Sequence, residues 1–453
     1  MEGMLFMGSS LTSEFTSAAH EALAADPCVR IARNAVTSAG VRKAARDPEA
    51  TALATTTFDI QLEQGEITDQ KRSGRCWMFA SLNTMRYRVM KKLGLKTFEL
   101  SQAYPLFWDK YERSNWFFEH IIATAGKPVT SREVAYLLTD PLCDGGQWDM
   151  FRSLVKKYGV VPKEAMPETV SSSSTGEMNK YLLRYLRSGA KRLRDALAAG
   201  ESADAVGTIK DELMQGVYRM LVICLGEPPA QFDVRIRDEK NELKASGTYT
   251  PQEFFAEFVD MDLDDYISII NAPTSDKPYL RSFTVKFLGN VIEDGQVRYV
   301  NLPIEALKRV AVAQLRDGLP VWFGSDVDQG FLREDGVLDP AAVDVDGLFG
   351  LPIETGLDKA ARLEYGESLM THAMTLQGVN LDAEGAPTRW RIENSWSDEH
   401  GKKGYDVASD AWFDEYVYQV VVDKKYLTDE ELAAYEGEPI ELAPWDPMGA
   451  LAR

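Results

Sequence analysis

Apolar residues recur at helical spacing in the segment that follows residue 75. Met78, Leu82, Met85 and Val89 are separated by four, three and four positions, which places them on one face of a helix. Two lysines and Gly94 then supply the basic last turn and the glycine that end many helices. The pattern predicts an amphipathic helix that begins near residue 76 and ends before Gly94.

The middle of the chain has the same helical period over a longer stretch, after a polar break at residues 167–174. Two apolar runs predict two long helices, one marked by Leu182, Leu183, Leu186, Leu193 and Leu197 and the next by Val206, Ile209, Leu213, Val217 and Leu221. Strand-like segments follow at 266–270, 282–287 and 297–300. We interpret residues 166–300 as an inserted, mainly helical subdomain.

The last third of the chain changes from helical to alternating periodicity. Segments 319–323, 370–379, 388–394 and 413–422 are rich in β-branched and aromatic residues and predict strands. A short acidic helix is expected after residue 426. Helices dominate early and strands dominate late, which is the order of an α+β protein.

Composition and charge narrow the class of protein. Of the 453 residues, 45% are hydrophobic and 26% are charged, so wholesale disorder is excluded. Fifty basic residues against seventy acidic ones give a net charge of −20. Such a surface repels a phosphate backbone, and we expect no general binding to nucleic acid. Four cysteines in a chain of this length exclude a disulfide scaffold.

The N-terminus and the longest apolar runs bear on where the protein resides. The apolar run at residues 4–7 is shorter than the roughly 7–15 residues of a secretory signal, and Glu2 stands where that signal has a basic residue. No segment approaches the ~18 apolar residues of a membrane span. We therefore expect a cytoplasmic protein with reduced thiols, in which Cys28, Cys143 and Cys224 are small buried hydrophobic residues.

Cys76 differs from the other cysteines because it stands at the start of the first predicted helix. The partial positive charge of a helix N-terminus favours the thiolate over the thiol, and a thiolate is a nucleophile when a base stands nearby. Gln70 lies six residues earlier, in the loop that enters the helix. Its side-chain amide and the Cys76 backbone N–H are two donors that can converge as an oxyanion hole.

The base for this thiol must come from the four histidines. His20 is expected on a surface helix and His120 in a packed or partly exposed helix, whereas His372 lies in a predicted strand. Asn394 ends the next predicted strand, from which its amide can orient an imidazole as the third member of a Cys-His-Asn triad. A cysteine at a helix start and a histidine in a strand are also ordinary core residues, so spacing alone leaves both interpretations open.

The segments around these residues resemble the motifs of the papain superfamily. Residues 70–80, QKRSGRCWMFA, are similar to its nucleophile helix, and residues 370–374 and 393–396 to its histidine and asparagine boxes. Further segments of the chain resemble one branch of the superfamily, bleomycin hydrolase and the bacterial aminopeptidase C. They are residues 100–102, 107–110, 144–148, 158–163, 321–324 and 445–452. The similarity runs from about residue 58 to the end. The 296 positions from Cys76 to His372 exceed the roughly 130–150 of compact relatives by about the size of the insertion.

The resemblance implies a papain-like, two-lobed α+β fold and gives the candidate residues their roles. Gln70 and the Cys76 N–H hold the oxyanion, and Cys76 attacks the acyl carbon. His372 takes and returns the proton, and Asn394 orients His372. Trp396 covers that pair from water. The resemblance implies no cofactor and no metal.

Gly145, Gly146 and Ser397 carry further expectations. Gly145 and Gly146 resemble the strip against which papain-like enzymes lay the substrate backbone, since adjacent glycines allow close approach. A simple helix start is the other interpretation of this segment. Ser397 stands where the family has a glycine after Asn-Ser-Trp, which puts the local loop geometry in doubt but removes no catalytic group.

The same resemblance divides the chain into five parts. These are an N-terminal segment packing on the catalytic core (1–57), a helical lobe with the nucleophile helix (58–165), the inserted subdomain (166–300), a β-rich lobe with His372 and Asn394 (301–425), and a C-terminal arm that enters the cleft (426–453). The family also implies a homohexamer.

The resemblance implies that the C-terminal arm makes the enzyme an aminopeptidase, because in the family this arm blocks one end of the cleft and brings a carboxylate near the α-ammonium of the substrate. Residues 448–452 are slim and nearly uncharged, so we expect Ala452 and Arg453 at the substrate. A frayed terminus is the alternative. Arg453 extends one residue beyond the ending typical of the branch, and we expect the enzyme to remove it.

The function implied is that of a cytosolic cysteine aminopeptidase acting on peptides with a free N-terminus and able to deamidate bleomycin-like amides. A papain-like endopeptidase is one alternative. Acyl transferases of the arylamine acetyltransferase and transglutaminase kind usually have Asp as the third member, so Asn394 argues against them. A non-catalytic cage or binding protein is a third alternative, against which the intact set of Cys76, His372, Asn394 and Gln70 argues.

Overall fold

The computed structural model describes residues 10–452, apart from residues 53, 55, 64, 354 and 400. The extreme N-terminus, on which the absence of a signal was argued, and Arg453 lie outside the described residues. Among the helices of the described part, none is long and apolar enough to cross a membrane.

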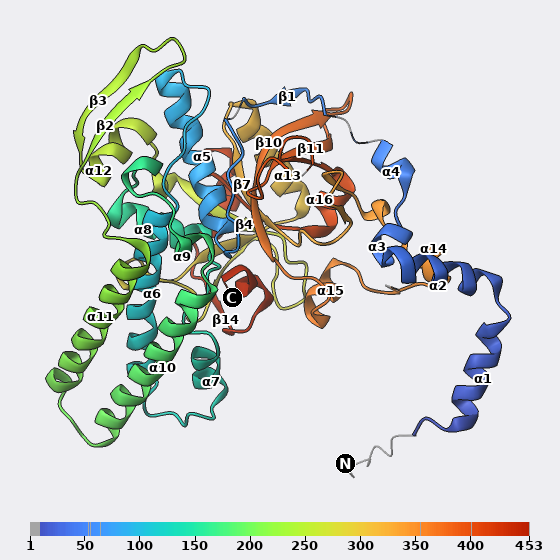
Figure 1. The fold of residues 1–453 in the computed structure, drawn as a ribbon, viewed down its shortest axis with the longest axis horizontal. Coiled ribbons are helices and arrows are strands. Elements are labelled where there is room, and N and C mark those ends of the chain that lie inside the picture. The colour runs from blue at the N-terminus through green and yellow to red at the C-terminus, as the bar shows by residue number, and fades with distance from the viewer. Residues whose placement is uncertain are drawn as a thin grey trace.

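A sheet of twelve strands lies at the centre of the molecule (Figure 1). Its order is β14-β5-β6-β4-β13-β7-β10-β11-β12-β9-β8, with β1 paired to β10. The strands are β1 (Ile60–Gln61), β4 (Tyr266–Ile270), β5 (Arg281–Val285), β6 (Arg298–Asn301), β7 (Val321–Ser325), β8 (Phe331–Leu332), β9 (Val337–Leu338), β10 (His372–Leu381), β11 (Pro387–Glu393), β12 (Tyr405–Ser409), β13 (Val417–Asp423) and β14 (Ile440–Leu442). The central strands β7 and β4 are buried along their whole length, as their continuous apolar sequences require.

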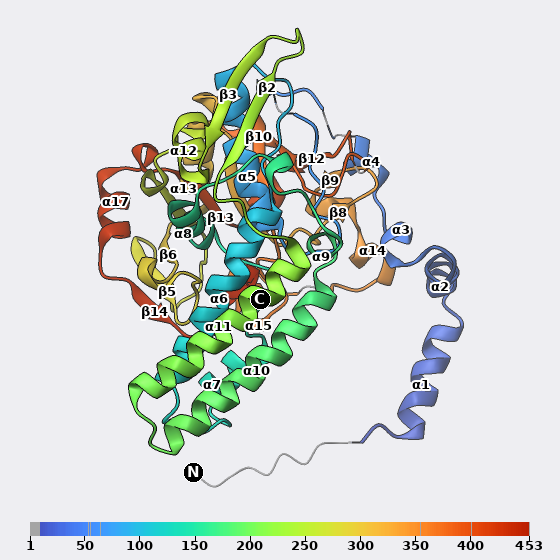
Figure 2. The same cartoon turned by 60° about the vertical axis from the view of Figure 1, so that its left-hand side comes forward.

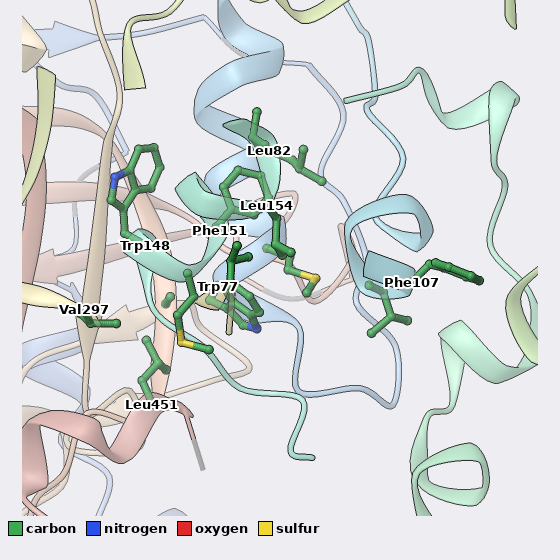
Figure 3. Close-up of a cluster of buried hydrophobic side chains, with 14 of the residues drawn as sticks. Trp77, Leu82, Phe107, Trp148, Phe151, Leu154, Val297 and Leu451 are labelled. Carbon is green, nitrogen blue, oxygen red and sulfur yellow. The ribbon is translucent and has the colours of Figure 1, made fainter. Parts of the chain in front are cut away.

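A helical layer packs against this sheet and contains the predicted helix α5 (Cys76–Leu93), followed by α6 (Ala103–Ala123), α7 (Arg132–Thr139) and α8 (Trp148–Tyr158). α5 ends at Gly94, which has a left-handed conformation, as the sequence pattern indicated. α5 lies against β10 through a core that includes Trp77 and Trp148. Figure 3 shows these two indoles gathered with Phe151 and with Leu451 from the far end of the chain.

The two long helices predicted for the insertion are confirmed as α10 (Gly176–Ala198) and α11 (Ala203–Leu225). They form a hairpin that packs along α6 (Figure 2), and the hairpin β2 (Phe232–Arg237) and β3 (Leu243–Tyr249) follows as a separate small sheet. The strands at 266–301 differ from the predicted division. β4 pairs with β13, and β6 joins β4 to β5, so these strands belong to the main sheet. Every residue of β4 is buried, and the sheet supplies the partners it needs.

The N-terminal helices α1 (Ser13–Ala24) and α2 (Pro27–Ala39) extend away from the body of the molecule (Figure 1). The prediction that this segment packs on the catalytic core is wrong for α1, which has no buried residue, whereas α2 has no fully buried residue but contacts α14 (Val345–Phe349). Phe15 and Ile31 are exposed, and so is Cys28, which was expected to be buried. The contacts with the body continue through α3 (Val41–Ala44) and α4 (Pro48–Ala52), where Ala50 packs against the β8–β9 region.

Most strands of the last third are confirmed, but the run at 413–422 is divided between two elements. Its first part belongs to α16 (Asp410–Tyr416), and only the rest forms β13. The Ser409 side chain caps α16 by accepting a hydrogen bond from the Trp412 N–H, which starts a helix despite the aromatic residues. The other helices here are α13 (Ile304–Arg316), α14 (Val345–Phe349), α15 (Lys359–Tyr365) and the predicted acidic helix α17 (Asp429–Glu436).

Candidate active site

A cleft of about 380 Å³ lies where the first turn of α5 faces the start of β10. The segments that line it come from widely separated parts of the chain: the loop before α5, the turn before α8, α10, the start of β10 and the C-terminal arm. The lining residues are Gln70, Gly74, Cys76, Asp140, Leu142, Cys143, Asp144, Gly145, Asn179, Leu183, Thr371, His372 and Leu451. The predicted nucleophile, base and oxyanion donor therefore share one cavity.

Cys76 is the first residue of α5 and is almost completely buried. Burial raises the pKa of its thiol to about 11, while the backbone amides of Ala373, Trp77 and Cys76 itself act in the opposite direction. Burial of the thiol thus opposes the thiolate that the helix N-terminus favours. Formation of the thiolate therefore depends on a base beside Cys76.

His372 is the first residue of β10 and stands beside Ala373, whose backbone amide reaches the Cys76 sulfur. Its Nε2 lies 2.9 Å from Asn394 Oδ1. Burial lowers the pKa of His372 to about 4, whereas the contact with Asn394 raises it. A neutral imidazole of this kind is able to accept a proton at neutral pH.

The three residues that follow β11 each hold a different part of the site. Asn394 contacts His372, as described. The Ser395 hydroxyl donates to Gln70 Oε1 over 2.7 Å, and the Trp396 indole stacks on the imidazole with ring centroids 4.5 Å apart. The predicted covering by Trp396 is thus present as a ring contact, whereas the part of Ser395 was missed because a serine in a loop gives no signal of its own.

Gln70 is buried and held from both ends of its amide. Its oxygen accepts from Ser395, and its nitrogen donates to the Ser73 carbonyl over 2.6 Å. One N–H of the amide remains for the cleft that Gln70 lines. Its backbone N–H also donates to the Ser395 carbonyl, so the loop before α5 is fixed to the loop after β11.

The loop between Gln70 and Cys76 is tied to the inserted subdomain by a buried arginine that the sequence analysis did not single out. Both terminal nitrogens of Arg75 donate to the Glu168 carboxylate at 2.9 Å, and its Nε donates to Ser73 Oγ at 2.9 Å. Ser73 Oγ in turn donates to the Gln70 carbonyl. A bidentate pair of this kind fixes geometry as well as charge, and it aligns the oxyanion loop directly before the nucleophile.

The adjacent glycines have two different roles. A Cβ on Gly145 would overlap with the carbonyl of Leu451, so Gly145 is where the backbone of the C-terminal arm approaches most closely. A Cβ on Gly146 would overlap with the Trp77 ring, so Gly146 permits packing on the buried indole. The strip that was expected to receive substrate backbone is thus covered in part by the arm.

The arm reaches the cleft from the edge of the sheet. β14 pairs in parallel with β5, and a 3-10 helix, Pro447–Ala452, follows. An ion pair from Lys277 to Asp446 (2.9 Å) and hydrogen bonds from Tyr299 and Gln147 to the Met448 carbonyl hold it. The alternative of a frayed terminus does not apply up to residue 452.

Cys143 holds the end of the arm. Its thiol donates to the Ala452 carbonyl over 2.8 Å and accepts from Arg113 Nη1 over 3.0 Å. Arg113 also donates to the Gly145 carbonyl, so the same guanidinium organises both the glycine strip and the thiol. The expectation that Cys143 is a buried hydrophobic residue is therefore wrong. It is half-buried, lines the cleft and makes polar contacts.

Ser397 has φ of +67°, which lies in the left-handed region that favours glycine. The serine therefore adopts the backbone conformation that a glycine would have at this position, which answers the question about the geometry of this loop. Its N–H donates to the Thr68 carbonyl, and its hydroxyl accepts from the Glu399 N–H. These contacts keep Trp396, its neighbour, over His372.

The arrangement combines a thiol at a helix start, a neutral imidazole oriented by an amide, and a side-chain amide donor beside the thiol. These are the parts of nucleophilic acyl transfer to a thiol. The fold and the site together define a papain-like cysteine peptidase.

Comparison with known proteins gives the particular family. The model of the Peptidase C1-like family matches residues 10–449, and the chain belongs to this family. It is 50% identical to aminopeptidase C of Streptococcus thermophilus over 98% of this chain and 99% of the relative. It is 41% identical to bleomycin hydrolase of Homo sapiens, over 98% and 99%. A crystal structure of PepW from Lactobacillus rhamnosis superposes with a TM-score of 0.95 at 47% identity, over 98% and 99%. The chain is a cysteine-type aminopeptidase.

Proposed function

We propose that Cys76, His372, Asn394 and Gln70 carry the aminopeptidase reaction and that the C-terminal arm limits it to the first residue of a peptide. The substrates are peptides with a free N-terminus and, by the resemblance to bleomycin hydrolase, amides of that kind. The observation that supports this most directly is the position of Leu451 and Ala452 against Gly145, beside Cys76 in one cleft.

The first half of the reaction forms a thioester. His372 removes the thiol proton as Cys76 Sγ attacks the carbonyl carbon of the first peptide bond. The oxyanion that develops accepts hydrogen bonds from the Cys76 backbone N–H and from Gln70 Nε2. His372 then gives its proton to the departing amine, and the C–N bond breaks.

The second half returns the enzyme to its starting state. Water attacks the thioester while His372 takes its proton, and the thiolate leaves and recovers that proton. Because burial disfavours an isolated charge on either Cys76 or His372, the imidazolium forms in each attack together with a negative charge on the reacting atoms, which in the attack of water is the oxyanion. Asn394 Oδ1 accepts from the imidazolium and stabilises it.

The arm explains why only terminal residues are removed. It fills the cleft over Gly145, where a longer peptide would lie on the acyl side of the cleaved bond. A terminal carboxylate there pairs with the α-ammonium of the substrate and discriminates against blocked N-termini. A papain-like endopeptidase would need that part of the cleft to be open.

The test compares a fluorogenic aminoacyl amide with its N-acetylated form. Wild type, Cys76→Ala and a chain that ends after Asp446 are assayed together, and Cys224→Ala serves as the matched cysteine control. We expect wild type and Cys224→Ala to cleave only the free amine, Cys76→Ala to cleave neither substrate, and the shortened chain to gain activity on the acetylated one. Equal cleavage of both substrates by wild type would contradict the gating role, and an active Cys76→Ala would contradict the nucleophile.

We further propose that Arg453 is removed by the enzyme itself, since Leu451 and Ala452 lie against Gly145 in the cleft that contains Cys76. Intact mass of purified wild type and Cys76→Ala measures this. Wild type should lack the mass of one arginine, whereas the inactive variant should keep it. A full-length mass for fully active wild type would overturn the proposal.

We propose, by the resemblance to the family, that the enzyme is a cytoplasmic homohexamer. The exposed apolar side chains of Phe15, Leu23 and Ile31 on α1 and α2 support association, because isolated helices with such side chains need a partner. Sedimentation velocity of the full chain tests the assembly, with a chain starting at residue 40 as the comparison. A wild-type chain that stays monomeric at micromolar concentration would contradict it.

A further inference from the structure

A buried carboxylate lies directly behind the Asn394 amide. Asp406 is in β12, opposite Ile392 of β11, two residues before Asn394. It is 2% exposed, and its Oδ2 accepts a hydrogen bond from Asn394 Nδ2 over 3.0 Å. Carboxylates are rarely buried without partners, and the reaction described above makes no use of this one.

The contacts of Asn394 determine which end of its amide faces the imidazole. The Ser395 backbone N–H donates to Asn394 Oδ1 over 2.8 Å, and a backbone N–H is only a donor. Asp406 accepts from Nδ2, and an ionised carboxylate is only an acceptor. The amide oxygen therefore faces His372 Nε2, so the neutral imidazole carries its proton on Nε2. Nδ1 is then left to accept the proton of the thiol.

The surrounding backbone is shaped around the carboxylate. Gly336 and Gly401 both have positive φ, and a Cβ on either would come within 3.0 and 2.9 Å of Asp406 Oδ1. Glycine at these two positions leaves the space in which the side chain lies. The two glycines also approach each other and the Tyr405 carbonyl closely, so the carboxylate is one of several groups that this tight backbone accommodates.

The charged groups near this chain of contacts are few. The Arg333 guanidinium lies 4.1 Å over the Trp396 ring and acts on both Asp406 and His372, and Asp328 acts on His372. Burial raises the pKa of Asp406 to about 6, and the hydrogen bond from Asn394 and the charge of Arg333 oppose that rise. The carboxylate is thus ionised at neutral pH and becomes protonated under mildly acidic conditions.

We propose that Asp406 is a positioning residue that acts on His372 through Asn394. Its carboxylate holds the amide in the orientation that receives Nε2–H, and its negative charge stabilises the imidazolium that forms when His372 takes the thiol proton. The proposal rests on the proposed role of His372 as the base. It extends the Cys-His-Asn arrangement by a fourth member that never touches the substrate.

The experiment compares the pH profiles of kcat/KM for wild type, Asp406→Asn and Asp406→Glu between pH 4.5 and 8.5. Asp149→Asn is the matched control, because Asp149 is also buried and hydrogen-bonded but contacts Ser268 and Arg298, outside the cleft. At pH 7.5 we expect Asp406→Asn to lose activity by about 10-fold to 100-fold, as for outer residues that orient a functional histidine. Asp406→Glu should keep an ionisation, and Asp149→Asn should keep the wild-type profile.

The shape of the profile separates positioning from a merely structural role. As pH falls through about 6, wild-type Asp406 takes up a proton and loses the charge that the Asn variant lacks at every pH. The ratio of wild-type to Asp406→Asn activity should therefore be large above pH 7 and shrink toward pH 5. A ratio that stays constant over this range would overturn the proposal.

A second measurement tests the proposal even if Asp406→Asn is less stable than wild type. The rate of Cys76 alkylation by iodoacetamide is measured on folded protein across the same pH range, with folding checked by near-ultraviolet circular dichroism. Asp406→Asn should be alkylated more slowly above pH 7, with the difference again closing at acid pH, and equal rates throughout would refute the proposal. Activity surviving in Cys76→Ala would instead refute the proposed function, so the two failures are distinguishable.

Discussion

The Trp396 indole lies over the His372 imidazole with 4.5 Å between the ring centroids and 27° between the ring planes. This contact keeps water from the imidazole, and burial is the main reason that the pKa of His372 is lowered to about 4. In the proposed mechanism the neutral imidazole is the base, so the lowered pKa keeps it in the active form over a wide range of pH.

Replacing the Trp396 indole should change the pH profile of kcat/KM while the protein stays folded. In Trp396→Ala the imidazole is hydrated, so its pKa should rise toward its ordinary value of 6.5. The acid limb of kcat/KM should move up by about 1–2 pH units, with the largest loss near pH 5.5. Trp396→Phe keeps an aromatic cover and should show a smaller shift. An unmoved limb in Trp396→Ala would mean that other groups bury His372.

Gln70 should matter for peptide hydrolysis but not for alkylation of the thiol. Gln70→Ala removes one of two proposed oxyanion donors, which typically lowers kcat by about 100-fold to 1000-fold. Alkylation of Cys76 by iodoacetamide develops no oxyanion, so its rate should change little. Gln102→Ala, another buried glutamine whose amide donates to Glu99 outside the cleft, is the control. Equal losses in both reactions would indicate a disturbed loop.

The hydrogen bond from Cys143 to the Ala452 carbonyl predicts a change in selectivity. Cys143→Ala removes the donor that holds the end of the arm. A hydrogen bond is worth roughly 1 kcal/mol net, so cleavage of the acetylated substrate relative to the free amine should rise about 5-fold.

Cys143→Ser keeps a donor at that position and should keep the wild-type ratio of the two rates. If the alanine and serine variants behave alike, the Cys143 contact does not control the arm. The measurement is the ratio of kcat/KM for the two substrates, which is insensitive to the fraction of active enzyme.

The left-handed backbone conformation of Ser397 predicts that a glycine at this position stabilises the protein. A residue other than glycine costs roughly 1–2 kcal/mol in the left-handed region, so Ser397→Gly should raise the free energy of unfolding by roughly 1 kcal/mol or remain neutral if the lost hydroxyl contact offsets the gain. Ser174→Gly, at an ordinary φ of −147°, should be neutral or destabilising. Chemical denaturation measures both, and a clear destabilisation by Ser397→Gly would show that its contact to Glu399 outweighs the strain.

The helix that carries Cys76 and the strand that carries His372 were predictable because each has a clear periodicity of apolar residues. The helix after residue 75 repeats every three to four positions, and β10 combines alternation with β-branched residues. The division of 413–422 was not predictable from the aromatic content, since a single hydrogen bond to Ser409 starts a helix there. Local capping outweighed strand propensity.

The site was predictable only as far as motifs extend. Cys76, His372, Asn394 and Gln70 stand in recognisable segments, and the structure brings their elements together. Arg75 and Ser395 lie within these segments too, but their contacts, like those of Asp406 and Cys143, join distant parts of the chain and leave no pattern in the sequence. The exposed N-terminal helices escaped prediction for a related reason, because amphipathic residues indicate that a partner exists without indicating which one.

The C-terminal arm, described up to Ala452, is attached to the sheet through β14. This attachment holds the arm at a fixed position in the cleft. A tethered segment is present at its site at an effective concentration of the order of millimolar, however dilute the enzyme. Short peptides in solution therefore compete for the cleft with a segment that is covalently attached to the enzyme. In the proposed gating, the space left between Leu451 and Cys76 fixes how much of each peptide is cut in one turnover, so the position of the arm sets the step size of the enzyme.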